Sequence, residues 1–458
     1  MITQSRVLKQ ISSYRLIPGM NARPTLAMCL MFVLPILAGY PVLAQPPETG
    51  SGGVEESRRS ILPTTNSKTG EKPDASESVD AADPEEPKIS TEDVIAEFKS
   101  LATGDDLEYG LEKIAAFDKA SASLTETLIK MRQQHTLIFN GYTDERGDYI
   151  RFRNEAREAI QDTYRAALDL VIVMPHPDAV RFVMTEVESR RKHDVYDNAT
   201  FEGSAKMMDL GIPMLYVAQA TARSAMMTGK FEVAKRIYEK LSDDEVEEID
   251  KALMAQYDKI KEQFEIEKTL LENDPEDLPK VRFRTTRGDF VVQLFINEAP
   301  STVSHFIQLV ESGFYDGCDF FQVVDGLLAL TGDPLGDGST EPEKFLKDEH
   351  GKPSVRMPLA GSLVMAKLPI PETPRFVPNS AGTQFAILYR HVPNVTEQQT
   401  VFGRVTEGMK VVGALRRMDP RKEKKKGEIK IPPDRILEAE VINRPEQLPE
   451  VIYASAPG

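Results

Sequence analysis

Two patterns of apolar and polar residues divide the chain. Residues 90–274 place apolar side chains at spacings of three and four, as in STEDVIAEFKSLA, where Val94 and Phe98 fall on one face. Such spacing is typical of amphipathic helices packed on a common core. Ser242 followed by Glu245 has the form of a capping box for the last helix. We therefore predict a helical bundle over this region.

The period changes near residue 278. The segment DPEDLP ends the last helix with two prolines, and VRFRTTRGDFVVQLF then alternates apolar and polar positions about an Arg287-Gly288-Asp289 turn. An alternating pattern of this kind predicts a β-hairpin. We therefore predict a second domain, rich in strands, over residues 279–445, followed by a tail at 446–458.

The first 89 residues differ from both patterns. Residues 1–44 join a basic segment to an apolar core of about 13 residues, with small residues before Gln45, as in an export signal. This core is shorter than the roughly 20 residues that a spanning helix needs, but a retained membrane anchor stays open as an alternative. Residues 45–89 are rich in Pro, Gly, Ser and acids, which predicts a disordered linker.

Composition narrows the possible partners. The net charge of −16 argues against a nucleic-acid partner, and the basic run at 421–426 is interpreted as a solvated turn. Removal of the signal would leave Cys318 as the one cysteine, which allows no disulfide within the chain. With six dispersed histidines and no phosphate-binding glycine loop, we expect neither a metal nor a cofactor.

Several segments of the C-terminal region have a familiar order. They are FRTTRGDFVVQLF, EAPSTVSHFIQLVESGFYDGCDFF, GDP at 332–334, GSLVMA, GTQFAI and TVFGRVTEGMKVV. Together they resemble the cyclophilin family of peptidyl-prolyl cis-trans isomerases over residues 280–445. The resemblance implies a closed eight-stranded antiparallel β-barrel capped by two helices. The expected fold is thus multidomain, α plus β, with a helical bundle before the barrel.

The chemistry of such a site can be stated from the amide bond. Rotation about an X-Pro bond faces a barrier of roughly 20 kcal/mol, so a catalyst must favour the twisted amide with an apolar pocket and a fixed donor. In the family the donor is an arginine, and its position falls on Gln322 in FFQVVDGLLALTGDP. Gln322 carries no charge. We therefore expect a loss of about 2–3 kcal/mol in transition-state stabilisation, or roughly 30- to 150-fold in rate.

The resemblance also places the substrate groove. Its residues are expected to be Phe321, Leu327, Leu328, Leu330, Met365, Ala366, Gln384, Phe385, Ala386, Val395 and Gln399. Several family aromatics and polar groups are replaced there, while Lys367 or Arg390 offers a cation to the vacated space. The proline-rich stretch 368–381 is longer than the family's loop. It is either an internal ligand of the groove or a stiff surface loop.

Three functions remain open at this stage. In the first, the chain is an exported prolyl isomerase of the periplasm or cell envelope that assists the folding of proline-containing clients, with weakened catalysis. In the second, the barrel binds peptides without catalysis and the helical region makes chaperone-like or scaffold contacts. In the third, the helical region carries the function and the barrel only mediates assembly. Both of the first two remain compatible with glutamine at position 322, and a measured rate of prolyl isomerisation distinguishes them.

Overall fold

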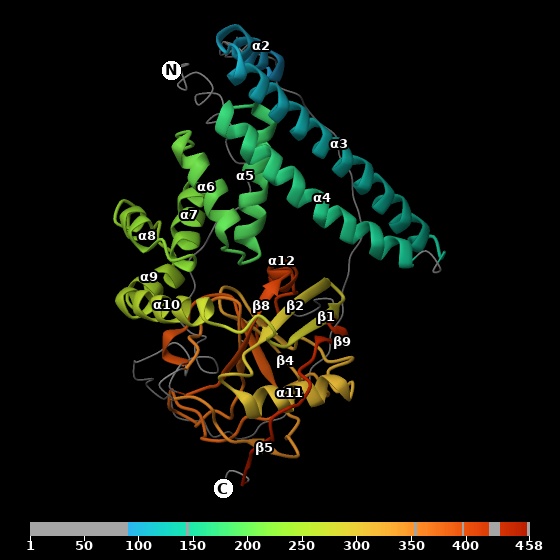
Figure 1. Ribbon diagram of the computed structural model, residues 1–458, viewed down its shortest axis with the longest axis vertical. Coiled ribbons are helices and arrows are strands. Elements are labelled where there is room, and N and C mark those ends of the chain that lie inside the picture. Colours follow the sequence, from blue (N-terminus) through green and yellow to red (C-terminus); the bar gives the residue numbers. More distant parts are fainter. Residues whose placement is uncertain (1–89, 143–145, 352–354, 396–397, 421–430, 456–458) are drawn as a thin grey trace, which may run out of the picture. The chain divides into compact units, whose positions relative to one another are not determined.

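The protein is represented by a computed structural model that describes residues 90–142, 146–351, 355–395, 398–420 and 431–455 (Figure 1). The predicted export signal, the predicted linker and the basic run at 421–426 lie outside these residues. Among the described helices, none combines the length and the apolar character needed to cross a membrane.

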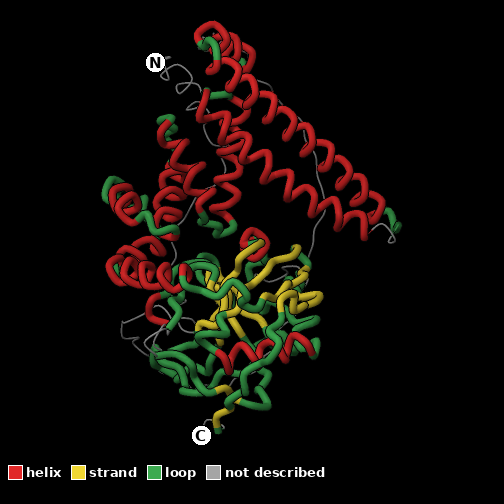
Figure 2. The backbone as a smooth tube through the Cα atoms, in the orientation of Figure 1, coloured by secondary structure: helices red, strands yellow, loops and turns green. Residues whose placement is uncertain are grey.

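Helices come first along the chain and strands follow, as the change in period predicted (Figure 2). The N-terminal helices are α2 (Thr91–Leu101), α3 (Asp105–Phe139), α4 (Arg146–Val173), α5 (Pro177–Lys192), α6 (Asn198–Asp209), α7 (Leu215–Met227), α8 (Phe231–Tyr238), α9 (Glu248–Met254) and α10 (Tyr257–Glu272). A capping box formed by Ser90 and Asp93 starts α2.

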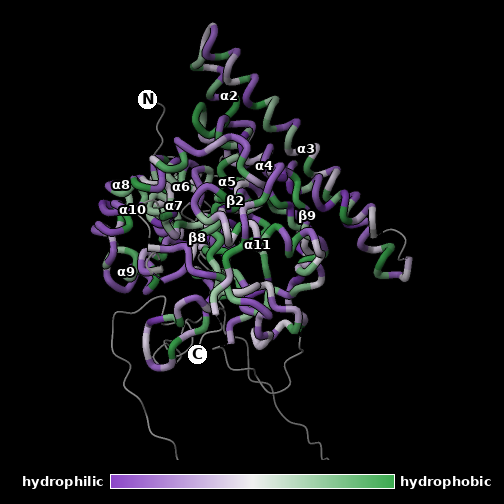
Figure 3. Tube along the Cα trace, turned by 60° about the horizontal axis from the view of Figure 1, so that its bottom comes forward, coloured by the Kyte–Doolittle hydropathy of each residue, from purple (hydrophilic) through white to green (hydrophobic). Residues whose placement is uncertain are grey.

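The long helices α3 and α4 lie side by side (Figure 1). Their inner faces and the neighbouring α5 and α6 bury one apolar cluster, which includes Tyr164, Leu170, Val183 and Met207. The outer part of α3 alternates between hydrophobic and hydrophilic positions (Figure 3), and Phe139 at its end is 84% exposed. The helical core is therefore concentrated where α4 meets α5 and α6.

The last part of the helical region differs from the prediction. Ser242 and Glu245 do interact, with the Glu245 carboxylate accepting from the Ser242 N–H at 2.9 Å, but the next helix begins only at Glu248. The Gln219 side-chain amide donates to the Glu245 carbonyl at 2.8 Å. This tertiary contact ties the segment before α9 to α7, where the sequence predicted the start of the helix.

The C-terminal region is an antiparallel barrel with helices at its ends. Its elements are β1 (Lys280–Thr285), β2 (Gly288–Leu294), α11 (Pro300–Glu311), β3 (Gln322–Val324), β4 (Leu328–Thr331), β5 (Phe345–Leu346), β6 (Ser362–Met365), β7 (Phe385–Leu388), η3 (Pro393–Val395), β8 (Val401–Glu407), α12 (Met409–Gly413), β9 (Ile436–Asn443) and β10 (Tyr453–Ala454). The main sheet has eight strands in the order β3-β4-β7-β6-β8-β2-β1-β9. The short strands β5 and β10 pair with each other.

Backbone hydrogen bonds bring the two edges of the main sheet together. The Phe320 N–H, just before β3, donates to the Asp434 carbonyl at 2.8 Å, and the Ile436 N–H of β9 donates to the Cys318 carbonyl at 2.9 Å. Inside, a cluster of rings from Phe283, Phe306 and their neighbours fills the core. The eight-stranded barrel with two helices that the resemblance implied is thus confirmed.

A buried network of charges joins the helical region to the barrel. Glu267 of α10 is fully buried and forms ion pairs with Arg404 of β8 at 3.0 Å and with Arg356 at 3.5 Å. It also accepts a hydrogen bond from the Met357 N–H at 2.8 Å. Arg356 pairs in addition with Asp274. The barrel therefore depends on helical residues for the neutralisation of its own buried cations.

Candidate functional site: a groove over four strands

A groove of about 300 Å³ lies over strands β3, β4, β7 and β6. Strand register puts Gln322 opposite Leu330, Leu330 opposite Ala386, and Ala386 opposite Val364, so these four residues form one row across the sheet. Their sequence neighbours Val323, Ala329, Ile387 and Leu363 belong to the barrel core. Because side chains alternate along a strand, the row faces away from that core and into the groove.

Most of the residues that the resemblance assigned to the groove do line it. They are Phe321, Gln322, Leu328, Leu330, Met365, Ala366, Gln384, Ala386 and Gln399. The structure places others elsewhere. Leu327 is 3% exposed and does not line the groove, although it belongs to the same apolar cluster as Leu328 and Ala386, and Phe385 packs in the barrel core. Val395 ends η3.

Gln322 occupies the first position of β3, at the edge of the main sheet. Its side chain is half-buried and forms no hydrogen bond with any residue that the structure describes. The Gln384 amide, by contrast, donates to the Gly338 carbonyl at 3.3 Å. Gln322 thus has a free amide group that can donate to a bound peptide, although without charge.

Lys367 lines the groove, but its ammonium group is already engaged. The Lys367 Nζ donates to Asp348 at 2.6 Å and to the Gln398 carbonyl at 3.0 Å. Burial alone would raise the pKa of Asp348, but hydrogen bonds from His350, Lys367 and the Asn379 N–H outweigh it and lower that pKa below its usual value. The Asp348 carboxylate therefore stays ionised near neutral pH, and Lys367, whose Nζ already donates to it, does not serve as a free donor.

Arg390 lies outside the groove. It is 6% exposed beside Arg223 and Asp250 of the helical region, and burial followed by repulsion from Arg223 lowers its pKa to about 10. Neither cation that the sequence offered therefore replaces the missing arginine. Gln322 remains the polar side chain at the position where the resemblance places the family's donor.

The proline-rich stretch 368–381 forms one wall of the groove. Its backbone folds on itself, with the Ile370 N–H donating to the Arg375 carbonyl at 2.9 Å and the Val377 N–H to the Leu368 carbonyl at 2.8 Å. Pro369 and Phe376 line the groove. The stretch is thus a hairpin-like rim that narrows access from one side.

Sequence reasoning missed several groove residues. Leu388 was within reach, because it lies two residues from Ala386 on the same short strand, whereas Val364 is placed in the groove by its register opposite Ala386. Asp348, which holds Lys367, had no such signal: it lies 19 residues earlier in an irregular segment. Gly338 and Pro342 also line the groove, and they too lie in an irregular segment whose position no periodic pattern predicts.

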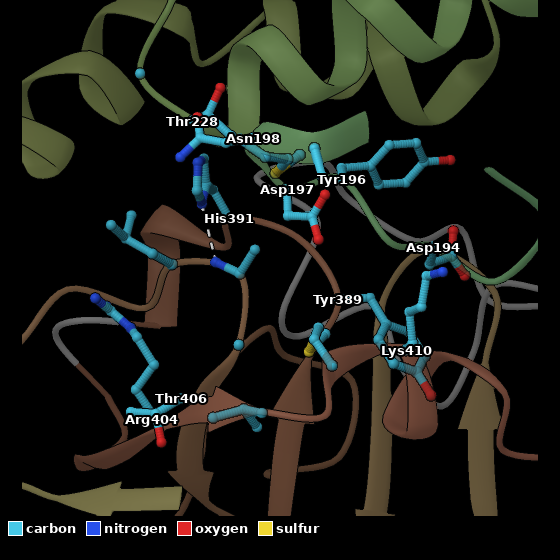
Figure 4. Close-up of a pocket in the computed structure, with 18 of the residues that line it drawn as sticks. Asp194, Tyr196, Asp197, Asn198, Thr228, Tyr389, His391, Arg404, Thr406 and Lys410 are labelled. Carbon is cyan, nitrogen blue, oxygen red and sulfur yellow. Dashed lines mark hydrogen bonds between the residues drawn. The ribbon is translucent and has the colours of Figure 1, made fainter. Parts of the chain in front are cut away.

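A larger cavity of about 960 Å³ lies where helical and barrel residues meet (Figure 4). Asn198 and Thr228 line it from the helical side, and Arg404 and Lys410 from the barrel side. These groups already have partners: Asn198 accepts from Lys230, and Lys410 pairs with Glu186 at 2.8 Å. Asn198 and Lys410 are therefore engaged within the chain, and the smaller groove, which holds the row from Gln322 to Val364, is the candidate site.

His391 at this cavity gives a pH prediction. Its Nδ1 accepts from the Ala360 N–H at 3.0 Å (Figure 4), and burial lowers its pKa to about 3, whereas an unfolded histidine titrates near 6.5. Between these values only the unfolded chain takes up the proton, so stability falls as the pH falls. Urea denaturation should show that the wild type loses about 2 kcal/mol more than His391→Asn between pH 7 and pH 5. Equal losses would mean that folded His391 accepts a proton.

Comparisons with known proteins agree with this geometry. The family model described as "Cyclophilin type peptidyl-prolyl cis-trans isomerase/CLD" matches residues 280–441. A peptidyl-prolyl cis-trans isomerase of Dictyostelium discoideum is 35% identical over 155 residues, which cover 33% of this chain and 93% of that protein. One from Helicobacter pylori is 30% identical over 156 residues, covering 31% of this chain and 86% of that protein.

Among solved structures, a cyclophilin type peptidyl-prolyl cis-trans isomerase of Cryptosporidium parvum is 24% identical and has a TM-score of 0.30, covering 37% of this chain and 99% of that one. The sequence matches define the class of the barrel. This chain belongs to the cyclophilin-type peptidyl-prolyl cis-trans isomerase family through its C-terminal region.

Proposed function

We propose that this chain is an exported prolyl isomerase of weakened catalytic power, which binds proline-containing segments of polypeptide clients in the groove. The observation that carries the proposal is the unpaired amide of Gln322 at the end of the row that continues through Leu330 and Ala386. An amide supports a twisted prolyl bond by a neutral hydrogen bond, which is roughly half as strong as a charged one. Slow but measurable catalysis follows from this.

The shape of the groove supports a prolyl ligand. Leu328, Leu330 and Ala386 give an apolar floor, and the rim at Pro369 and Phe376 encloses it. These aliphatic side chains offer a proline ring contact area without an aromatic face. Binding is therefore expected to be weaker than in a groove with aromatic walls, but of the same chemical kind.

A second candidate function is peptide binding without catalysis. It is favoured by the engagement of Lys367 with Asp348, which leaves no free cation among the described groove residues to assist the twisted amide. In this case the groove recognises prolyl or extended segments, and the chain acts as a holding factor. The two candidates differ in one measurable quantity, the rate of isomerisation.

The test is a protease-coupled isomerisation assay on the full chain with an X-Pro tetrapeptide, beside peptide binding by calorimetry. We expect catalysis above the uncatalysed rate, and a five- to tenfold lower kcat/KM in Gln322→Ala at unchanged affinity, because about 1 kcal/mol of neutral hydrogen bonding is lost. If the chain binds the peptide but the peptide isomerises at the uncatalysed rate, the second candidate is favoured. If the chain neither binds the peptide nor accelerates its isomerisation, both candidate functions are rejected.

Export is proposed from the pattern of residues 1–44. Cell fractionation and mass spectrometry of the mature chain test it, with cleavage expected near Ala44. A chain recovered outside the cytoplasm with its first residues intact would indicate a retained anchor. A chain recovered inside the cytoplasm would reject export.

A further inference from the structure

The turn between β3 and β4 is held by the helical region. This turn joins the strand that carries Gln322 to the strand that carries Leu328 and Leu330. At its centre, the Gly326 N–H donates to the Asp194 carboxylate at 2.8 Å. Asp194 follows α5, so a helical residue grips the groove hairpin by its end.

Packing encloses the same turn. Gly326 has a φ of 61°, and a Cβ added there would lie 2.2 Å from the Cδ1 of Ile249 in α9. Only glycine fits a left-handed turn with a neighbour this close. The helical region thus contacts the turn through Asp194 and through Ile249.

Asp194 also holds a cation that braces the hairpin. The Arg417 guanidinium donates to the Asp194 carboxylate at 2.8 Å and to Asp325 of the turn at 2.6 Å. Asp194 is 7% exposed, and its backbone adopts a left-handed φ of 55°, which is uncommon for a residue with a side chain. The surrounding contacts maintain this conformation.

The contact continues from Arg417 to the groove. The next residue, Met418, exchanges two backbone hydrogen bonds of 2.9 Å with Val323, which directly follows Gln322. Strand β3 has only three residues, so its position depends on β4, on Met418 and on the turn. Asp194 contacts the turn directly and supports the Met418 segment through Arg417.

We propose that Asp194 is a positioning residue for the prolyl groove, through which the helical region fixes the β3–β4 hairpin and thereby the placement of Gln322. The helices are then part of the site's construction, and a partner that displaces α5 or α9 alters the groove. This inference rests on the proposed function only in assigning the groove to prolyl peptides. The placement of Gln322 is open to test without any ligand.

The experiment compares three variants of the full chain. Asp194→Gly removes the carboxylate while tolerating the left-handed backbone, and Asp194→Asn keeps an acceptor for the Gly326 N–H. Glu186→Gln is the matched control, because Glu186 also joins the two regions, through Lys410 at 2.8 Å, but at α12 rather than at the hairpin. Two quantities are measured. The first is the chemical shift of the Gln322 side-chain amide in a ¹⁵N-glutamine-labelled chain, and the second is the affinity for an X-Pro peptide.

We expect Asp194→Gly to shift the Gln322 resonance and to weaken peptide binding by about 5- to 20-fold, since a charge-assisted contact is lost. Asp194→Asn should weaken binding by less than about threefold, and Glu186→Gln should leave both readouts unchanged. A wild-type Gln322 resonance in Asp194→Gly, or an equal shift in Glu186→Gln, would overturn the inference. If the wild type binds no prolyl peptide, the proposed function fails, but the Gln322 resonance still decides the role of Asp194.

Discussion

Replacing Glu267 with alanine is expected to destabilise the folded chain by about 3–5 kcal/mol, because the change leaves buried charges without their partner. The Glu267 carboxylate is fully buried between Arg404 at 3.0 Å and Arg356 at 3.5 Å. It also accepts from the Met357 N–H at 2.8 Å, so a buried backbone donor loses its acceptor as well. Asp274 still pairs with Arg356 in the variant, but Arg404 has no second acidic partner among its ion pairs in the described residues.

Urea unfolding followed by circular dichroism measures this effect. Glu265→Ala is the matched control on the same helix, since Glu265 is exposed and forms no ion pair with a described residue. It should change the free energy of unfolding by less than about 0.5 kcal/mol. If the two variants unfold alike, the charge network contributes nothing to the joining of helices and barrel.

Patterns within one element were predictable from the sequence. The alternation about Arg287-Gly288-Asp289 gave a hairpin that corresponds to β1 and β2, because each strand has one face in the barrel core. The start of α2 is also local, because Ser90 and Asp93 form a capping box within one turn. The resemblance then supplied what local patterns cannot, namely the order of the strands in the closed sheet.

Features that depend on distant residues were not predictable. The sequence around Glu267 does not predict its ion pair with Arg404, which lies 137 positions later. In the same way, Phe385 matches a groove position of the family but packs in the barrel core, and Leu327 joins the apolar cluster of the groove floor without lining the groove. A residue's position in a motif predicts the strand on which it lies. The exposure of its side chain to the groove depends on the residues that pack around it. Asp194 and Lys367 acquire their roles only through tertiary contacts.

The barrel depends on the helical region for the partners of its buried arginines and of the turn beside its groove. Arg356 and Arg404 find their acidic partners on or just after α10, and the turn at Gly326 finds its acceptor in Asp194. A barrel cut out of the chain would expose these groups or leave them unpaired. Measurements on the full chain therefore report on the groove in its native form.

Substitution of Gln322 is the most direct test of how the groove would catalyse prolyl isomerisation. Gln322→Arg is expected to raise kcat/KM for an X-Pro peptide by about 30- to 150-fold, equivalent to 2–3 kcal/mol, because a guanidinium gives charge-assisted hydrogen bonds to the twisted amide. The side chain of Gln322 is half-buried and unpaired with any described residue, so the longer arginine displaces no existing hydrogen bond. The effect should appear mainly in kcat, because the charge acts most strongly on the transition state.

Gln322→Met is the matched control, since it keeps the length of the side chain without its donor, and it should fall below the wild type. Gln322→Lys separates charge from geometry: a point charge without the planar fork should give a smaller gain than arginine. If arginine leaves the rate unchanged while peptide affinity is intact, the missing charge is not what limits catalysis. The limit would then lie in the aliphatic floor at Leu330 and Ala386, where a proline ring lacks an aromatic contact.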